Sequence, residues 1–155
     1  MTGPLEEAYR AHADELVRYA TTFVGPDRAA DVVTDAFLAV YDGHSRDVEH
    51  TRAYLYRAVF HRSVDVRRSR DRRRRREDRV ERERLRAATS PAIEVSVDAR
   101  RALDTLSDQQ RAVVFLTYWA DHPPSVVADL LGVSEGTVRK QLARARRRLR
   151  EVLDV

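Results

Sequence analysis

The sequence predicts an all-α protein built as two small helical domains. Its 155 residues, 43% of them hydrophobic, suit one ordinary domain or two small ones. Apolar residues recur at three- and four-residue intervals in both halves of the chain, which is the spacing of one face of a helix. An arginine-rich segment without an apolar face separates the halves. We therefore expect domains at residues 1–66 and 97–155, joined by a linker over residues 67–96.

The first domain is expected to hold three helices around one core. The first helix spans residues 5–24 and ends where Gly25 and Pro26 break the pattern. The second spans about residues 28–41, and the third follows a polar loop and runs from about residue 51 to the arginine-rich segment. The positions expected to meet in the core are Leu5, Tyr9, Leu16, Ala20, Phe23, Ala29, Val33, Phe37, Val40, Leu55, Tyr56, Val59, Phe60 and Val64.

Positive charge is concentrated in the linker. Residues 67–86 hold 12 arginines against 5 acidic residues, whereas residues 1–66 hold 7 basic and 11 acidic groups. Such segregation indicates directed electrostatics. Because the segment has no apolar face, we interpret it as a linker, with helix expected only at its start.

The second domain is expected to end in a helix-turn-helix over residues 126–150. Ser107 is a good cap for an earlier helix that contains Val113, Val114, Leu116 and Tyr118. Gly132 can take the left-handed conformation that ends a helix, and Ser134 caps the next one. The last helix should turn one apolar stripe to the core, made of Val138, Leu142, Ala145, Leu149 and Val152.

The opposite side of this last helix is basic. At 100° per residue it presents Lys140, Ala143, Arg144 and Arg147, with Arg139 on the flank. A face of this kind fits the major groove of DNA. The alternative is a helical hairpin whose charged face is only solvated.

Several function classes find no support in the sequence. The chain has no cysteine, its five glycines are scattered, and it shows no nucleophile elbow. His44 and His50 share a loop with Asp47 and Glu49, which is weak evidence for a metal site. We therefore expect no enzyme, cofactor or metal. With no apolar run beyond nine residues and no leader-like start, we also expect a cytoplasmic protein that does not insert into membranes.

The order of motifs resembles one family. Residues 28–41 are similar to the helix with which bacterial sigma factors of the extracytoplasmic-function (ECF, group IV) type dock on RNA polymerase. Residues 52–68 resemble the helix that reads and melts the minus-ten promoter element, and residues 102–116 resemble the start of the region that reads the minus-thirty-five element. The resemblance covers nearly the whole chain. It implies a dissociable initiation subunit that directs core polymerase to promoters and helps to melt them.

The resemblance also implies which residues contact promoter DNA. The minus-thirty-five contacts fall on Thr137, Arg139, Lys140, Ala143, Arg144 and Arg147, while Arg146 and Arg148 are left to phosphates or solvent. The minus-ten contacts fall on Arg52, Tyr54, Arg57, His61 and Arg62. Tyr54 replaces a common tryptophan and His61 an asparagine of the family, so the minus-ten preference departs from the usual one. Pro123 and Pro124 replace a polar cap, which proline tolerates in a first helical turn.

Docking on the clamp helices of the polymerase beta-prime subunit is implied for Asp31, Thr34, Asp35 and Leu38. Spacing alone places Asp31, Asp35 and Leu38 on one exposed stripe. The two aspartates are like charges four residues apart, and such a pair destabilises an isolated helix by a few tenths of a kcal/mol. The same stripe could be an ordinary acidic surface.

The sequence leaves alternatives open for the function and for the linker. One alternative function is a conventional helix-turn-helix regulator, which would bind operator DNA without polymerase. The linker could thread through polymerase, grip DNA nonspecifically or stay solvated. We expect a monomer when free, and the resemblance leaves room for an anti-sigma factor as a further partner.

Overall fold

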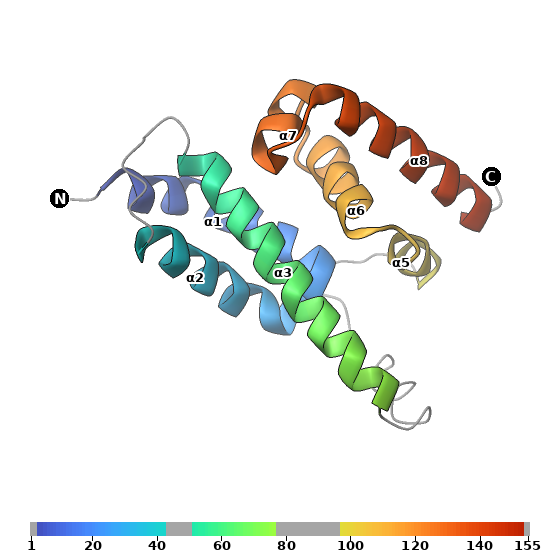
Figure 1. Cartoon of the computed structure of the whole chain (residues 1–155), viewed down its shortest axis with the longest axis horizontal. Coiled ribbons are helices and arrows are strands. Elements are labelled where there is room, and N and C mark those ends of the chain that lie inside the picture. Colours follow the sequence, from blue (N-terminus) through green and yellow to red (C-terminus); the bar gives the residue numbers. More distant parts are fainter. Residues whose placement is uncertain (1–2, 43–50, 77–96, 154–155) are drawn as a thin grey trace.

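The computed structural model describes residues 3–42, 51–76 and 97–153, and within these ranges it contains helices and no strands (Figure 1). The elements are α1 (Pro4–Val24), α2 (Pro26–Asp42), α3 (Thr51–Arg76), α5 (Val97–Asp104), α6 (Asp108–Val114), the π-helix η1 (Phe115–Trp119), α7 (Pro124–Leu131) and α8 (Glu135–Leu153). This confirms the all-α prediction. No helix in the described ranges is long and apolar enough to cross a bilayer.

The N-terminal unit consists of α1, α2 and α3, and each of these helices packs on the other two. Gly25 separates α1 from α2 with φ +83°, a value that glycine adopts without strain. At the centre Tyr19 and Tyr56 are fully buried with ring centroids 5.7 Å apart. Most of the expected core positions are buried, whereas Tyr9, Phe37, Val40 and Phe60 pack at its margin.

The C-terminal unit consists of α5 to α8 together with η1. Ser107 caps α6 in a complete capping box, because its hydroxyl accepts from the Gln110 N–H while the Gln110 side chain accepts from the Ser107 N–H. Gly132 ends α7 in the left-handed conformation, at φ +69°. The Ser134 hydroxyl accepts from the backbone of Thr137 at the start of α8. The predicted helix-turn-helix and its caps are therefore confirmed as structure.

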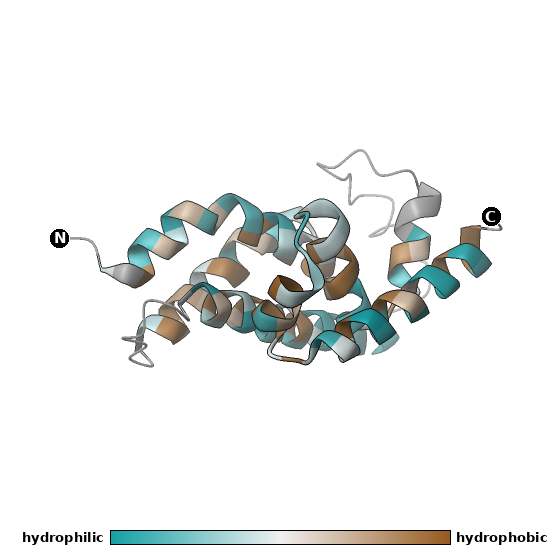
Figure 2. Ribbon diagram, turned by 90° about the horizontal axis from the view of Figure 1, so that it is seen from above, coloured by the Kyte–Doolittle hydropathy of each residue, from teal (hydrophilic) through white to brown (hydrophobic). Residues whose placement is uncertain are grey.

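The two units share one continuous core. α3 lies against α7, and the Tyr19 ring of α1 lies 5.3 Å from the Phe115 ring of η1. Brown, apolar segments accordingly gather where the helices meet in Figure 2. We call this packing the closed arrangement. The division into residues 1–66, 67–96 and 97–155 stays a prediction, although α3 continues to Arg76, ten residues into the range assigned to the linker.

Two apolar residues of the C-terminal unit lie outside the core, and one of them, Val152, was expected within it. Tyr118 is 52% exposed because the chain winds as a π-helix from Phe115, with an Ala120 N–H to Phe115 C=O bond, and the wider turn rotates Tyr118 away from the core. Val152 is 38% exposed because it lies about two turns beyond Ala145, where α8 packs in the cluster with Leu106 and Val114.

Candidate DNA-binding and protein-docking surfaces

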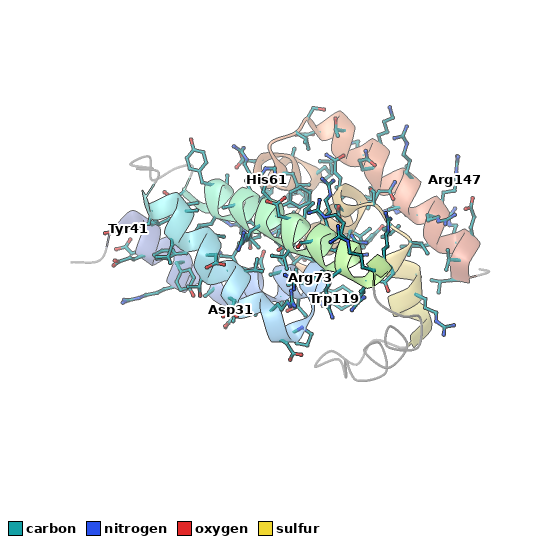
Figure 3. All side chains as sticks on the ribbon, turned by 60° about the horizontal axis from the view of Figure 1, so that its bottom comes forward. Asp31, Tyr41, His61, Arg73, Trp119 and Arg147 are labelled. Atoms are coloured by element: carbon teal, nitrogen blue, oxygen red, sulfur yellow. The ribbon has the colours of Figure 1, made fainter. Side chains whose placement is uncertain are left out.

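The outer face of α8 is open to solvent. Arg139, Lys140, Ala143, Arg144 and Arg147 are all exposed, and Figure 3 shows Arg147 pointing away from the rest of the molecule. Behind them Val138 and Ala145 are completely buried against the C-terminal unit. A rigid helix backed by packed side chains thus presents a row of cations, as insertion into a groove requires.

Two of the remaining α8 residues are engaged within the chain. The Thr137 hydroxyl lies 2.9 Å from the Ser134 hydroxyl, so Thr137 belongs to the helix cap as well as to the predicted DNA face. Arg146 donates to the Tyr118 hydroxyl and stacks over that ring at 5.6 Å. Sequence reasoning left Arg146 to phosphate or solvent and missed this contact, because the π-helix that turns Tyr118 outward left no signal in the periodicity.

The acidic stripe of α2 has the geometry that the spacing predicted. Asp31, Thr34, Asp35 and Leu38 are all exposed, and Leu38 exposes half of its surface. The Thr34 hydroxyl bonds to the Ala30 carbonyl of the same helix. Tyr41, which sequence reasoning left out, extends the stripe by one turn and is 57% exposed. An apolar and acidic strip of this kind suits a protein partner with basic and apolar groups.

The predicted minus-ten residues on α3 divide into two groups. Tyr54, His61 and Arg62 are exposed, and Arg62 pairs with Asp35 of α2 at 3.3 Å. Both partners of that pair are half exposed, so it contributes little to stability. Figure 3 shows His61 on α3 between Asp31 of α2 and Arg147 of α8.

The C-terminal unit holds the other two, Arg52 and Arg57. Arg57 donates to the Asp129 carbonyl at 2.9 Å and stacks over the Tyr54 ring at 5.9 Å. Its guanidinium lies against Gly132, where an added Cβ would come within 2.9 Å of Arg57 Nε. The glycine of the helix-turn-helix therefore serves the close approach of α3 as well as the turn.

Arg52 enters a polar network between the units. Nε2 of His122 lies 3.0 Å from both the Arg52 guanidinium and Oε1 of Glu15, while the Tyr56 hydroxyl donates to the same carboxylate. This nitrogen can accept from Arg52 only without its proton and donate to Glu15 only with it. Burial favours the neutral form of Glu15, but the bonds from Tyr56 and His122 outweigh it and hold the Glu15 pKa below its ordinary value. Burial and the Glu15 carboxylate raise the Tyr56 pKa.

Two further arginines join the units, and sequence reasoning did not single them out for this role. Arg111 is buried, donates to the carbonyls of Thr22 and Leu103, and has its pKa lowered to about 10, chiefly by burial. Arg67 pairs with Asp108 at the start of α6. An arginine between glutamines and valines gives little sign in the sequence that it will be buried.

In the described part of the chain no group of three metal-binding side chains comes together. The loop with His44, Asp47, Glu49 and His50 lies outside the described residues.

Comparison with known proteins gives a consistent set of relatives. The family model described as Sigma-70, region 4 matches residues 96–149, which run from α5 to the main part of α8. The RNA polymerase sigma-E factor of Streptomyces coelicolor is 33% identical over 152 residues, covering 96% of this chain and 85% of the relative. The ECF RNA polymerase sigma factor SigM of Mycobacterium tuberculosis is 30% identical over 151 residues, covering 96% of this chain and 76% of the relative.

Two solved structures share the fold. One is CnrH in complex with the cytosolic domain of CnrY, with a TM-score of 0.68 at 24% identity, covering 97% of this chain and 87% of that one. The other is the sigma factor RpoE of Bartonella quintana in complex with the anti-sigma factor NepR, with a TM-score of 0.64 at 23% identity, covering 97% and 96%. Both alignments span the two helical units together.

Proposed function

We propose that this chain, which belongs to the ECF family of RNA polymerase sigma factors, binds core RNA polymerase and directs it to promoters through two DNA-binding surfaces, α8 and α3. The main support for this assignment is the basic face of α8, which is exposed to solvent while Val138 and Ala145 on the opposite side of the helix are fully buried. In this role the chain performs no catalysis and acts in the cytoplasm, where it supplies sequence recognition to the polymerase.

On α8, Arg139, Lys140 and Arg144 are the proposed base contacts in the minus-thirty-five element. An arginine that bonds a guanine edge with two hydrogen bonds adds about 1 to 3 kcal/mol of base discrimination. Arg139 lies 3.5 Å from Glu135, a solvated pair that releases the guanidinium at small cost. Arg147 is proposed to meet phosphate, which adds affinity without sequence preference.

On α3, Tyr54 and His61 are the proposed contacts with the melted minus-ten strand. Tyr54 offers an aromatic plane for an unstacked base, and stacking of this kind contributes about 1 to 3 kcal/mol per base. Arg62 provides positive charge beside them for the backbone. On α2, the strip of Asp31, Asp35 and Leu38 is proposed to dock on the clamp helices of the beta-prime subunit.

Simultaneous use of both DNA surfaces requires the closed arrangement to open. The two elements lie roughly 25 base pairs apart by their names, or about 85 Å of duplex at 3.4 Å per pair. A compact chain of 155 residues has a radius of gyration of about 15 Å. The units must therefore separate on the promoter, and the separation frees Arg52 and Arg57, which the C-terminal unit holds in the closed arrangement.

An anti-sigma factor is proposed as a further partner. The sigma factor RpoE is similar to this chain along both units and was solved with its anti-sigma factor. A protein that binds both units of the closed arrangement would stabilise it by linkage and so oppose polymerase binding.

The test is transcription in vitro with purified core polymerase and a pool of genomic fragments. New discrete start sites that depend on this chain are the expected result. Specific DNA binding in the absence of core, without new start sites, would instead identify a conventional regulator.

A further inference from the structure

α3 is longer than the core requires. Its last buried residue is Val64, yet the helix continues to Arg76, and residues 67–76 contain eight arginines. In Figure 1 this light-green end runs past the ends of α1 and α2. Val66 still packs against the core, but apolar packing does not explain the ten helical residues that follow it.

The arginines of this end divide by contact. Arg67 pairs with Asp108, and Arg70 donates to the Val24 carbonyl at 3.1 Å, so both hold the fold together. Arg68, Arg72 and Arg75 are exposed. Of these three, Arg68 has one long contact, 3.9 Å to Asp108, at 69% exposure of its side chain. Within the described residues Arg72 and Arg75 have no carboxylate partner.

Arg73 and Arg76 are exposed as well, but only three of the exposed arginines share a face with the proposed minus-ten contacts. At 100° per residue, Arg68, Arg72 and Arg75 all fall within about 40° of His61, and so does Tyr54 on the other side of it. We name Arg68, Arg72 and Arg75 the arginine stripe. Asp65 is the one acidic residue on this face among the described positions 54–76.

We propose that the arginine stripe binds the phosphate backbone of duplex DNA beside the minus-ten element. This inference rests on the proposed function. From His61 to Arg75 the helix rises about 21 Å, which matches roughly six base pairs of duplex. Guanidinium groups on one rigid helix are well suited to phosphate oxygens.

The composition of the helix end favours duplex backbone over other polyanions. Residues 67–76 contain no apolar side chain, so they offer a membrane no face to bury. They contain no aromatic ring on which the bases of a single strand could stack. Charge and hydrogen-bond donors along a line remain, and these complement a phosphate backbone.

The experiment compares the triple variant R68Q/R72Q/R75Q with R10Q/R18Q/R73Q in the full chain. The control removes the same charge from exposed arginines outside the stripe, two on α1 and one on α3. The readout is the affinity of each reconstituted holoenzyme for one promoter between 50 and 200 mM salt. The stripe variant can no longer neutralise three phosphates, so the slope of log affinity against log salt should become shallower by about 3. Between 50 and 200 mM salt, the fold-loss of affinity of the variant should therefore be roughly 40 times smaller than that of the wild type. The control should keep the wild-type slope.

Core-dependent initiation by the wild-type chain is measured first, and its absence would reject the proposed function rather than the stripe. If the stripe variant and the control show equal slopes, the duplex contact is wrong. If the stripe variant loses affinity for core polymerase without DNA, the arginines face the polymerase and the inference is equally wrong. Should the triple variant melt at a lower temperature than the control, R72Q/R75Q replaces it, with an expected slope change of about 2.

Discussion

The faces of α8 and α3 are both proposed to hold promoter DNA, yet the closed arrangement leaves only one of them open. The cations of α8 are exposed on a helix that is backed inside its own unit. On α3, Tyr54 and His61 are exposed, whereas Arg52 and Arg57 bond to the C-terminal unit. The α8 surface lies entirely within the C-terminal unit and is therefore available to DNA in the closed arrangement. The α3 surface is partly covered by the C-terminal unit and becomes fully available when the two units separate.

We expect the largest effect on stability from a substitution of Gly132, because the turn before α8 contacts Arg57 of α3 at this position. Gly132→Ala places a side chain at φ +69° and a Cβ within 2.9 Å of Arg57 Nε. The left-handed conformation alone costs about 1 to 2 kcal/mol. We expect the free energy of unfolding, measured by urea denaturation, to fall by at least that amount.

The background variant Arg57→Ala separates the two costs. In it, Gly132→Ala should lose only the conformational part, because the guanidinium is gone. If Gly132→Ala costs the same in both backgrounds, the close approach of α3 to the turn does not matter to stability.

Arg144→Ala tests the open surface. It should lower transcription from a cognate promoter by about fivefold or more, because a base contact contributes about 1 to 3 kcal/mol of discrimination. Nonspecific DNA binding should change much less. Arg148→Ala is the matched control, since Arg148 lies on α8 and pairs with Glu151 at 3.6 Å. If Arg144→Ala weakens promoter-specific and nonspecific binding equally, Arg144 contacts only phosphate and not a base.

The acidic strip of α2 belongs to neither DNA surface and should affect a different step. We expect D31K/D35K to weaken the binding of core polymerase several-fold in a pull-down or fluorescence titration while the thermal unfolding temperature changes little. E7K/D14K carries the same charge change on exposed positions of α1. Undiminished core binding by D31K/D35K would remove α2 from docking.

A smaller effect concerns pH and the network that covers Arg52. The folded-state pKa of Glu15 lies below its ordinary value, so its contribution to stability is complete above about pH 4.5 and is lost as pH falls through the lowered pKa. The unfolding temperature of the wild type should therefore fall more steeply on acidification below pH 4.5 than that of Glu15→Gln. Parallel curves would show that the bonds from Tyr56 and His122 contribute nothing to stability.

The sequence predicted the helices and the α8 face well because both depend on local periodicity. Leu16, Val33, Val59 and Val138 were identifiable by their spacing, and the caps at Ser107 and Ser134 by residue type. The contacts between the units could not be predicted in this way. Arg57 meets Asp129 across 72 positions of sequence, and no periodic pattern encodes such a pairing.

The end of α3 shows a second limit of sequence patterns. The arginine run was interpreted as the start of a linker, with helix expected only there, and periodicity could not show that α3 itself would continue through it to Arg76. Arg67 and Arg70 find partners on α6 and at the end of α1, so tertiary bonds support a helix that the pattern alone did not favour. The π-helix at Phe115–Trp119 escaped for a related reason, because it changes the helical period on which the prediction depends.

The separation of the two units on the promoter can be measured directly. The chain has no cysteine, so Ala11→Cys on α1 and Ser125→Cys on α7 allow one dye on each unit at exposed positions. Energy transfer between the dyes should be high in the free protein and fall by an amount that corresponds to tens of ångströms when core polymerase and promoter DNA are added. High transfer that persists in a transcribing complex would contradict the proposal that both DNA surfaces act together only after the closed arrangement opens.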